Sequence, residues 1–242
     1  MFNYKANYLK NKTSWDNEIG FMYGFVNNSG QGFRKTLDRI FLDTKVGHKL
    51  SNTWDLYASL NFISQFSKGF NYEDDANGVE QELLISDIFA PAFVTMAIGF
   101  EYHPADYFKV RISPVAPRVT IVQDNNGRFD EVSTTAPYGV AIGETTRFEW
   151  YAFQLTADFD KEIAKNINLK WRYLMYANYE TLRAEEIDHR MDLLISARVN
   201  KFISVGLGGI LLYDFDQVNE LQYSQVFNIG FAYSFQNYEE KK

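Results

Sequence analysis

The feature that most constrains this 242-residue chain is hydrophobicity that alternates with period two over segments of roughly 10 to 16 residues. In FNIGFAYSF, residues 227–235, large apolar residues alternate with small or polar ones. Alternation of this kind is typical of strands with one apolar face, and almost no stretch has a helical period. Eleven segments carry the pattern: 2–10, 14–26, 34–48, 53–67, 92–104, 107–121, 148–162, 165–180, 186–199, 202–215 and 222–235.

Segment length and face composition separate a soluble sheet from a membrane barrel. Strands of globular sheets average about five or six residues, whereas membrane-barrel strands span about 9 to 11 in the lipid plus their ends. The polar faces here hold Gly, Ala, Ser and Asn with charges of both signs, which suits a crowded lumen better than bulk water. Aromatic residues make up 17% of the chain. Several lie near the ends of apolar faces, as in a lipid-headgroup girdle: Trp15, Trp54, Trp150, Tyr102, Tyr179 and Tyr213.

The sequence therefore predicts an all-β fold, an antiparallel up-and-down transmembrane β-barrel of the bacterial outer membrane, over a soluble sandwich or a lipocalin-like barrel. Residues 1–235 form a single barrel domain in this prediction, and residues 236–242 form a short polar tail. Outer-membrane lipid is the expected surroundings.

The connections between the predicted strands alternate between tight turns and longer loops. Tight ones fall near 11–13, 49–53, 104–106, 162–165 and 200–201, and long ones at 27–33, 68–91, 122–147, 181–185 and 216–221. Bacterial barrels have short periplasmic turns, longer outer loops and an even strand number. We therefore expect twelve strands in the intact barrel, with one strand and a signal peptide preceding Met1. Residues 137–147 are open between an extra strand and an inward loop. Pro114 and Pro117 predict a bulge or bend that takes Arg118 off the regular register.

Composition excludes several functions. The net charge of −7 argues against a nucleic-acid partner. Without cysteine there is no disulfide, thiolate metal site or Cys nucleophile. The acidic run 72–82 and the stretch 123–131 lack the ligand spacing of an EF-hand. We predict no cofactor and no metal.

Charged residues on the polar sides of the strands are the candidate site. They are Glu18, Arg39, Asp43, Lys45, Glu101, Lys109, Arg111, Asp158, Lys170, Arg172, Arg190, Asp192 and Arg198. Two interpretations are open: charges lining a pore that selects ions or small solutes, or a salt-bridged network that fills a narrow interior. The mixed signs favour pairing, and the two can coexist.

Catalysis has little support in the sequence. Of three histidines, His48 and His103 fall at tight turns, and His189 lies in DHRMD with no serine two residues on. The chain is accordingly predicted not to be an enzyme.

Four stretches carry a family resemblance: KTLDRIFLDTKVGHKL (35–50), QFSKGFNY (65–72), ISDIFAPAFVTMAIGFEYHP (85–104) and RISPVAPRVTIV (111–122). Over about residues 14–215 the chain resembles an uncharacterised family of Bacteroidetes outer-membrane proteins, known only as a domain of unknown function. The resemblance implies a signal-bearing barrel with a further strand, often holding a Trp and paired Gly, ahead of the segment that opens here. It implies no activity.

Three functions follow as expectations. The first is a passive, porin-like channel for small polar solutes or ions. The second is a non-conducting scaffold that contacts other outer-membrane proteins through loops 68–91 and 122–147, since 83–93 is unusually apolar for a loop. The third and weakest is a membrane-embedded hydrolase.

Overall fold

The computed structural model describes residues 2–30, 32–129, 136–215 and 218–231. These residues form fifteen strands and two single-turn 3-10 segments. None of the described segments is a helix long and apolar enough to cross a membrane. The predicted all-β class is confirmed.

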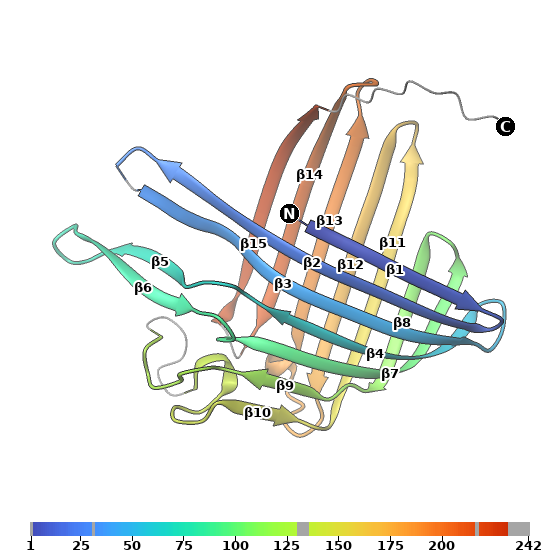
Figure 1. Cartoon of the computed structure of the whole chain (residues 1–242), viewed down its shortest axis with the longest axis horizontal. Coiled ribbons are helices and arrows are strands. Elements are labelled where there is room, and N and C mark those ends of the chain that lie inside the picture. The colour runs from blue at the N-terminus through green and yellow to red at the C-terminus, as the bar shows by residue number, and fades with distance from the viewer. Residues whose placement is uncertain (1, 31, 130–135, 216–217, 232–242) are drawn as a thin grey trace.

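One antiparallel sheet dominates the molecule, and its main path contains eleven strands (Figure 1). In spatial order they are β1 (Phe2–Lys10), β2 (Thr13–Asn28), β3 (Gly32–Lys49), β4 (Trp54–Ser64), β7 (Ala92–Ala105), β8 (Phe108–Val115), β11 (Ala152–Ala164), β12 (Ile167–Asn178), β13 (Asp188–Arg198), β14 (Ile203–Asp214) and β15 (Val218–Phe231). Each corresponds to one of the eleven segments predicted from period-two alternation. The end of the last predicted strand, 232–235, and the predicted tail lie outside the described residues.

The sheet is open in the structure. Its edges are β1 and β15, which are not paired with each other within the described residues. The predicted closed barrel is therefore not established. Since all neighbours on the path are antiparallel, the first and the eleventh strand run in the same direction.

Short connections gather at one end of the sheet, here called the turn end: 11–12, 50–53, 106–107, 165–166 and 199–202. The opposite end, called the loop end, holds the longer connections. The predicted alternation is confirmed with two corrections. The expected long loop 27–33 is the tip of a hairpin, because β2 and β3 stay paired as far as Asn28 and Gly32. The expected long loop 216–221 is shorter, because β15 begins at Val218, which is paired with Asp214 on β14.

Two long loops contain short strands that the alternation did not predict. β5 (Gly69–Asp74) and β6 (Glu80–Ser86) form a separate hairpin that projects beside the β2–β3 hairpin (Figure 1). β9 (Arg118–Ile121) pairs with β7 and with β10 (Thr146–Glu149). Residues Pro137–Gly139 form a 3-10 turn rather than a strand.

The prolines bend the sheet as predicted. The run that starts as β8 is broken at Ala116 and Pro117 and continues as β9 beside the same neighbour, β7. The adjacent run is broken in the same way between β10 and β11. The extra strand β10 therefore extends an existing strand line and leaves the up-and-down order unchanged.

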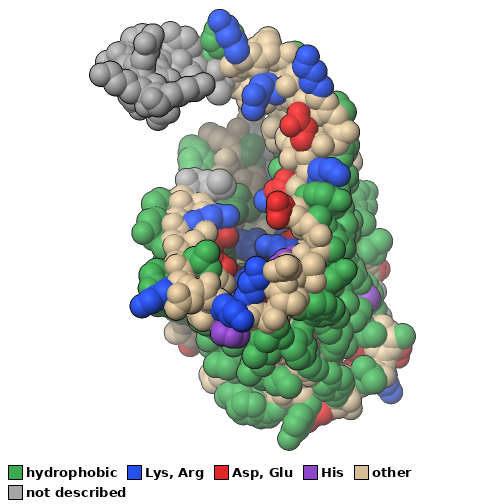
Figure 2. Space-filling view, turned by 90° about the vertical axis from the view of Figure 1, so that its right-hand side faces the viewer, with side chains coloured by type: hydrophobic (Ala, Val, Ile, Leu, Met, Phe, Trp, Pro, Cys, Tyr) green, Lys and Arg blue, Asp and Glu red, His purple; other side chains and the backbone are tan. Residues whose placement is uncertain are grey.

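The two faces of the sheet are inverted relative to a soluble protein. Large apolar side chains stand exposed along the outer face, such as Phe231 on β15, which is 74% exposed. Figure 2 looks into the turn end, where hydrophobic side chains cover the outer wall and charged ones surround a hollow. The clusters of fully buried apolar side chains are small. Burial alone would not hold such a sheet together in water.

A second apolar cluster joins the long loops. Ala90, Val122, Phe129 and Val140 are buried together, and Leu84 and Ile85 pack against them. The apolar loop stretch predicted at 83–93 is thus used in part to hold loops 68–91 and 122–147 to one another.

Candidate functional site

Charged side chains from six strands form a continuous chain of ion pairs on the concave face, which we call the ion-pair belt. Its members are Asp16, Lys45, Glu101, Arg111, Asp158 and Arg172. The Nζ atom of Lys45 lies 3.6 Å from a carboxylate oxygen of Asp16 and 3.0 Å from one of Glu101. On the other side of Glu101, the Nε atom of Arg111 lies 3.7 Å from the Glu101 carboxylate. Cations and carboxylates therefore alternate around the wall.

The belt continues on the next strands through Asp158. This carboxylate lies 3.0 Å from Nη2 of Arg111 and 2.6 Å from Nε of Arg172. Asp158 and Arg172 are directly opposite each other on β11 and β12. Directly opposed residues of antiparallel strands point to the same face, so the register itself brings this pair together.

The belt crosses β4 between Lys45 and Glu101. Lys45 is directly opposite Ser59 on β4, whereas Glu101 on β7 is opposite Asp55, four residues from Ser59. The long lysine side chain therefore crosses β4 diagonally to reach Glu101. Four carbons between Cα and the ammonium give lysine this reach.

Burial differs along the belt. The side chain of Glu101 is 8% exposed, whereas that of Arg172 is 53% exposed. A buried charge is tolerated only when it is paired, and Glu101 has two cationic partners. Arg172 is held by one carboxylate and has most of its surface in the hollow.

Other predicted lumen residues form separate pairs. Lys170 lies 3.5 Å from Asp160 on the neighbouring strand. Arg190 donates two hydrogen bonds of 2.8 Å to Asp192 on its own strand.

The remaining carboxylates of the predicted set lie on β2 and β3. The Glu18 carboxylate lies 3.3 Å from the Nζ atom of Lys5. Asp43 accepts a hydrogen bond of 3.4 Å from the side-chain amide of Asn61. Glu18 also lies near enough to Arg172 on β12 for their charges to interact, although β2 and β12 are far apart in the sheet order. The sheet is therefore curved so that distant strands face each other.

Three predicted cations have no ion-pair partner among the residues that the structure describes: Arg39, Lys109 and Arg198. Arg39 places its guanidinium 5.1 Å from the ring centre of Phe41. Arg198 is exposed at the turn end of β13. Arg39 and Lys109 thus add half-buried cations that are not within ion-pair distance of a described carboxylate.

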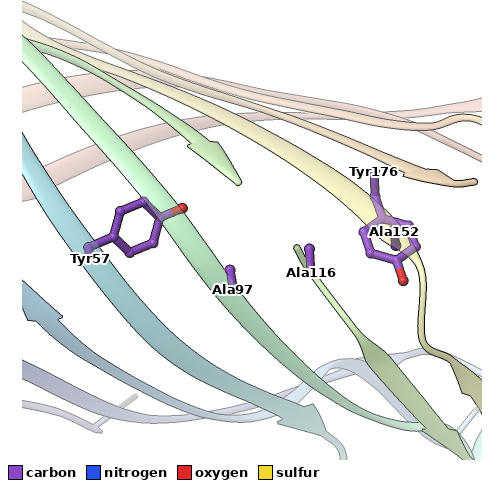
Figure 3. Packing of buried hydrophobic residues seen from close by; sticks show 5 residues of the cluster. All are labelled: Tyr57, Ala97, Ala116, Ala152 and Tyr176. Carbon is purple, nitrogen blue, oxygen red and sulfur yellow. The ribbon is translucent and has the colours of Figure 1, made fainter. Parts of the chain in front are cut away.

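A layer of aromatic and small side chains lies further along the interior (Figure 3). Tyr57, Ala97, Ala116, Ala152 and Tyr176 are buried together there. The Tyr57 hydroxyl is hydrogen-bonded to that of Ser113 on β8. We call this set the tyrosine layer. By register, Tyr57 lies at the level of the belt and Tyr176 lies nearer the loop end.

Beyond this layer, Arg118 lies over the ring of Tyr176, with 3.4 Å between guanidinium carbon and ring centre, and pairs with Asp188 at 2.9 Å. The break at Pro117 shifts the alternation. Inward positions before it are odd-numbered, such as Ser113, and those after it are even-numbered, such as Thr120. Arg118 thus leaves the regular register, as predicted, and the shift carries it into the interior.

The predicted set of lumen residues did not include Asp16, Tyr57 and Tyr176. Asp16 shares the parity of Glu18 on the same predicted strand, so alternation alone was enough to find it. Alternation does place both tyrosines on the polar sides of their strands, but the predicted set was restricted to charged residues.

The loops are held by a further ion pair. Arg128 donates to Asp87 at 2.7 Å and so joins loops 68–91 and 122–147. Partial burial raises the pKa of Asp87, but the Arg128 hydrogen bond and the Ile88 N–H outweigh it, and the pKa lies below its usual value. The Asp75 carboxylate of the acidic run 72–82 accepts the N–H groups of Asn77 and Val79 and thereby closes the β5–β6 turn.

The groups considered for chemistry are placed as follows. His189 forms a 2.8 Å hydrogen bond through Nδ1 with the Tyr173 hydroxyl, and His48 lies 3.2 Å from the Thr13 hydroxyl. Among the described residues, no group of three or more His, Asp and Glu side chains is arranged to hold a metal ion.

An antiparallel sheet with an apolar outer face and a charged concave face defines the class of the protein: an all-β protein whose two faces are inverted relative to a soluble sheet. The sequence profile of a family described as protein of unknown function (DUF3078) matches residues 1–70. The resemblance to a family of unknown function is thus confirmed over these residues. Its Bacteroidetes origin and its extension to residue 215 stay predictions. A search of curated proteins gives no match.

Among solved structures, the chain is similar to OmpT (in-vitro folded), an outer membrane protein of Vibrio cholerae, with 11% identity and a TM-score of 0.38. The match covers 95% of this chain and 62% of that one. The fold assignment rests on the strand pairing described above. The sequence-based prediction that the chain is not an enzyme is corrected here, because a match to an outer-membrane protein gives no reason to exclude catalysis.

Proposed function

We propose that this chain forms the wall of an outer-membrane β-barrel that passes small polar solutes or ions through its interior. The observation that carries the proposal is the inversion of the two faces. Apolar side chains stand on the convex side, and charged side chains surround a hollow on the concave side (Figure 2). A lipid bilayer stabilises the first, and a water-filled lumen accommodates the second.

Strand direction supports closure by one more strand. The edges β1 and β15 run the same way, so a strand between them that runs opposite to both completes an all-antiparallel cylinder. The count is then twelve, which satisfies the even number of bacterial barrels. The facing charges of Glu18 and Arg172 agree with a sheet already curved toward closure.

The ion-pair belt is the proposed selectivity element. All six of its charges are paired, but the side chain of Arg172 is 53% exposed. Outside the belt, Arg39 and Lys109 are half-buried cations without ion-pair partners in the described part of the chain. Fixed charges at the wall of a narrow pore select mobile ions of the opposite sign. We expect a preference for anions.

Conductance in planar bilayers tests the channel. For the barrel with its closing strand present, we expect stable unitary steps with anion selectivity, which Arg172→Glu shifts toward cations. Lys161→Glu is the matched control, because Lys161 lies on the neighbouring strand β11 with its ammonium over the ring of Tyr107 on the outer face. A reversal-potential shift equal in both variants would contradict selection at the belt.

A second candidate is a non-conducting scaffold. It is favoured by the tyrosine layer, which fills part of the interior with buried side chains. Silent bilayers from a protein that shows heat-modifiable gel migration, and is therefore folded, would favour the scaffold. Its proposed contacts with other outer-membrane proteins run through loops 68–91 and 122–147.

A further inference from the structure

A cleft separate from the hollow lies at the loop end, between the β2–β3 hairpin and the β5–β6 hairpin. The two hairpins project from the same side of the sheet (Figure 1). The space between them has a volume of about 510 Å³. Small-molecule sites commonly have volumes of roughly 300–1,000 Å³. We call this space the hairpin cleft.

Aromatic rings line the cleft from both hairpins. Tyr23, Phe25 and Phe33 belong to β2 and β3, and Phe70 and Tyr72 belong to β5. Phe25 and Phe33 meet edge to face, with ring centres 5.5 Å apart. The three rings of β2 and β3 are more than half exposed. Rings on two independent supports offer flat surfaces to a ligand that lies between them.

Polar groups in the cleft are held in position by the protein. The Arg34 guanidinium lies 3.9 Å from the ring centre of Tyr72 and is paired with Glu80. The ammonium of Lys35 lies 2.9 Å from Asp38 and donates to the backbone carbonyl of Ser67 at 2.8 Å. Because these side chains are already held in place, less conformational entropy is lost when they order around a bound ligand.

The rim supplies both a donor and an acceptor. Lys68 and Glu82 line the cleft and have no ion-pair partner among the described residues. An ammonium donates only and a carboxylate accepts only, so together they suit a group that does both. A hydroxyl is such a group.

We propose that the hairpin cleft binds a neutral saccharide chain. Pyranose rings present apolar C–H faces that pack on aromatic rings, and their hydroxyls both donate and accept hydrogen bonds. Arg34 and Lys35 are neutralised by Glu80 and Asp38, and Lys68 is balanced by Glu82, so the cleft has no net positive charge to favour an anionic ligand. The site is independent of conduction, because it lies outside the hollow.

The test is isothermal titration calorimetry on the barrel with its closing strand present, folded in a detergent without a sugar headgroup. The probes are short oligomers of glucose, mannose and N-acetylglucosamine, with oligogalacturonate as the acidic counterpart. We expect saturable binding of at least one neutral oligomer and weaker binding of the acidic one. Tyr72→Ala and Phe25→Ala, which remove one ring from each hairpin, should each weaken binding about tenfold.

The matched control is Tyr223→Ala, which removes an exposed aromatic ring from the outer face of β15, away from the cleft. It should leave the affinity unchanged. The proposal is overturned if no neutral oligomer binds, if the acidic oligomer binds as well as the neutral ones, or if the control weakens binding as much as the cleft variants. Unitary conductance measured on the same preparations separates failure of this site from failure of the channel.

Discussion

At the scale of single residues, the concave face is defined by how its charges are neutralised. Glu101 is buried between the side chains of Lys45 and Arg111, whereas the pair of Lys170 and Asp160 remains 60% and 55% exposed. Removing one member of a buried pair leaves an uncompensated charge, and an exposed pair contributes little. Similar contacts at different depths should therefore have unequal effects on stability.

Glu101→Gln should lower the free energy of unfolding by about 3 kcal/mol, the lower end for a broken buried pair, because Lys45 and Arg111 retain Asp16 and Asp158. Asp160→Asn should lower it by less than about 1 kcal/mol. Urea titration of both variants in lipid vesicles measures the difference. Equal losses would mean that the belt is hydrated like the rest of the hollow.

At the scale of elements, the close approach of β7 and β8 depends on one glycine. A Cβ atom added to Gly99 would lie 2.0 Å from the carbonyl oxygen of Ile112 and 2.7 Å from the Cα atom of Ser113. The ladder shifts register here, between Ile98 and Phe100. Backbone atoms cannot rotate away as a side chain would, so the strands themselves must separate.

We expect Gly99→Ala to destabilise the folded sheet by about 1–3 kcal/mol or more. Gly209→Ala on β14 is the control, since its nearest atom, the Ser224 carbonyl oxygen, is 4.0 Å away. It should change stability by no more than about 0.5 kcal/mol. Heat-modifiable gel migration at increasing temperature compares the two, and matching profiles would show that β7 and β8 can move apart without loss.

At the scale of the whole molecule, lipid on the convex side is what distinguishes this sheet from a soluble one. Leu207 on β14 is 50% exposed, and it is paired with Ile195 and Phe227 on the same outer face. Leu50, in a turn at the turn end, is 52% exposed. The two leucine side chains are thus exposed to nearly the same extent, but only Leu207 would contact the hydrocarbon of a bilayer.

Leu207→Arg should cost about 2–4 kcal/mol of stability in lipid vesicles, the range for arginine near the bilayer midplane. Leu50→Arg should cost less than about 1 kcal/mol, because the turn lies outside the hydrocarbon region. Urea-dependent folding into vesicles gives both values. If Leu207→Arg left the free energy of unfolding unchanged, the membrane assignment would be contradicted, since substitutions on the exposed surface of soluble proteins change stability little.

The strands were predictable because period-two alternation is a local property. Segments such as 202–215 carry it with few interruptions, and β14 follows it closely. The β5–β6 hairpin was not predicted, since its acidic turn and short strands resemble a solvated loop. Its structure depends on Asp75 closing the turn, which composition does not reveal.

The sequence by itself determined the fold class, the order of the eleven main strands and, within an uninterrupted strand, which charged residues share a face, because side-chain direction in a strand depends only on parity. Tertiary structure decided which charges meet: Lys45 on β3 reaches Glu101 on β7 because β4 pairs with both strands in a register that sets the two residues diagonally across it. It also decided that Arg118 lies inside, through a break whose shift in parity depends on how β9 pairs with β7 and β10. Register and curvature arise from contacts between distant segments, and no local pattern encodes them.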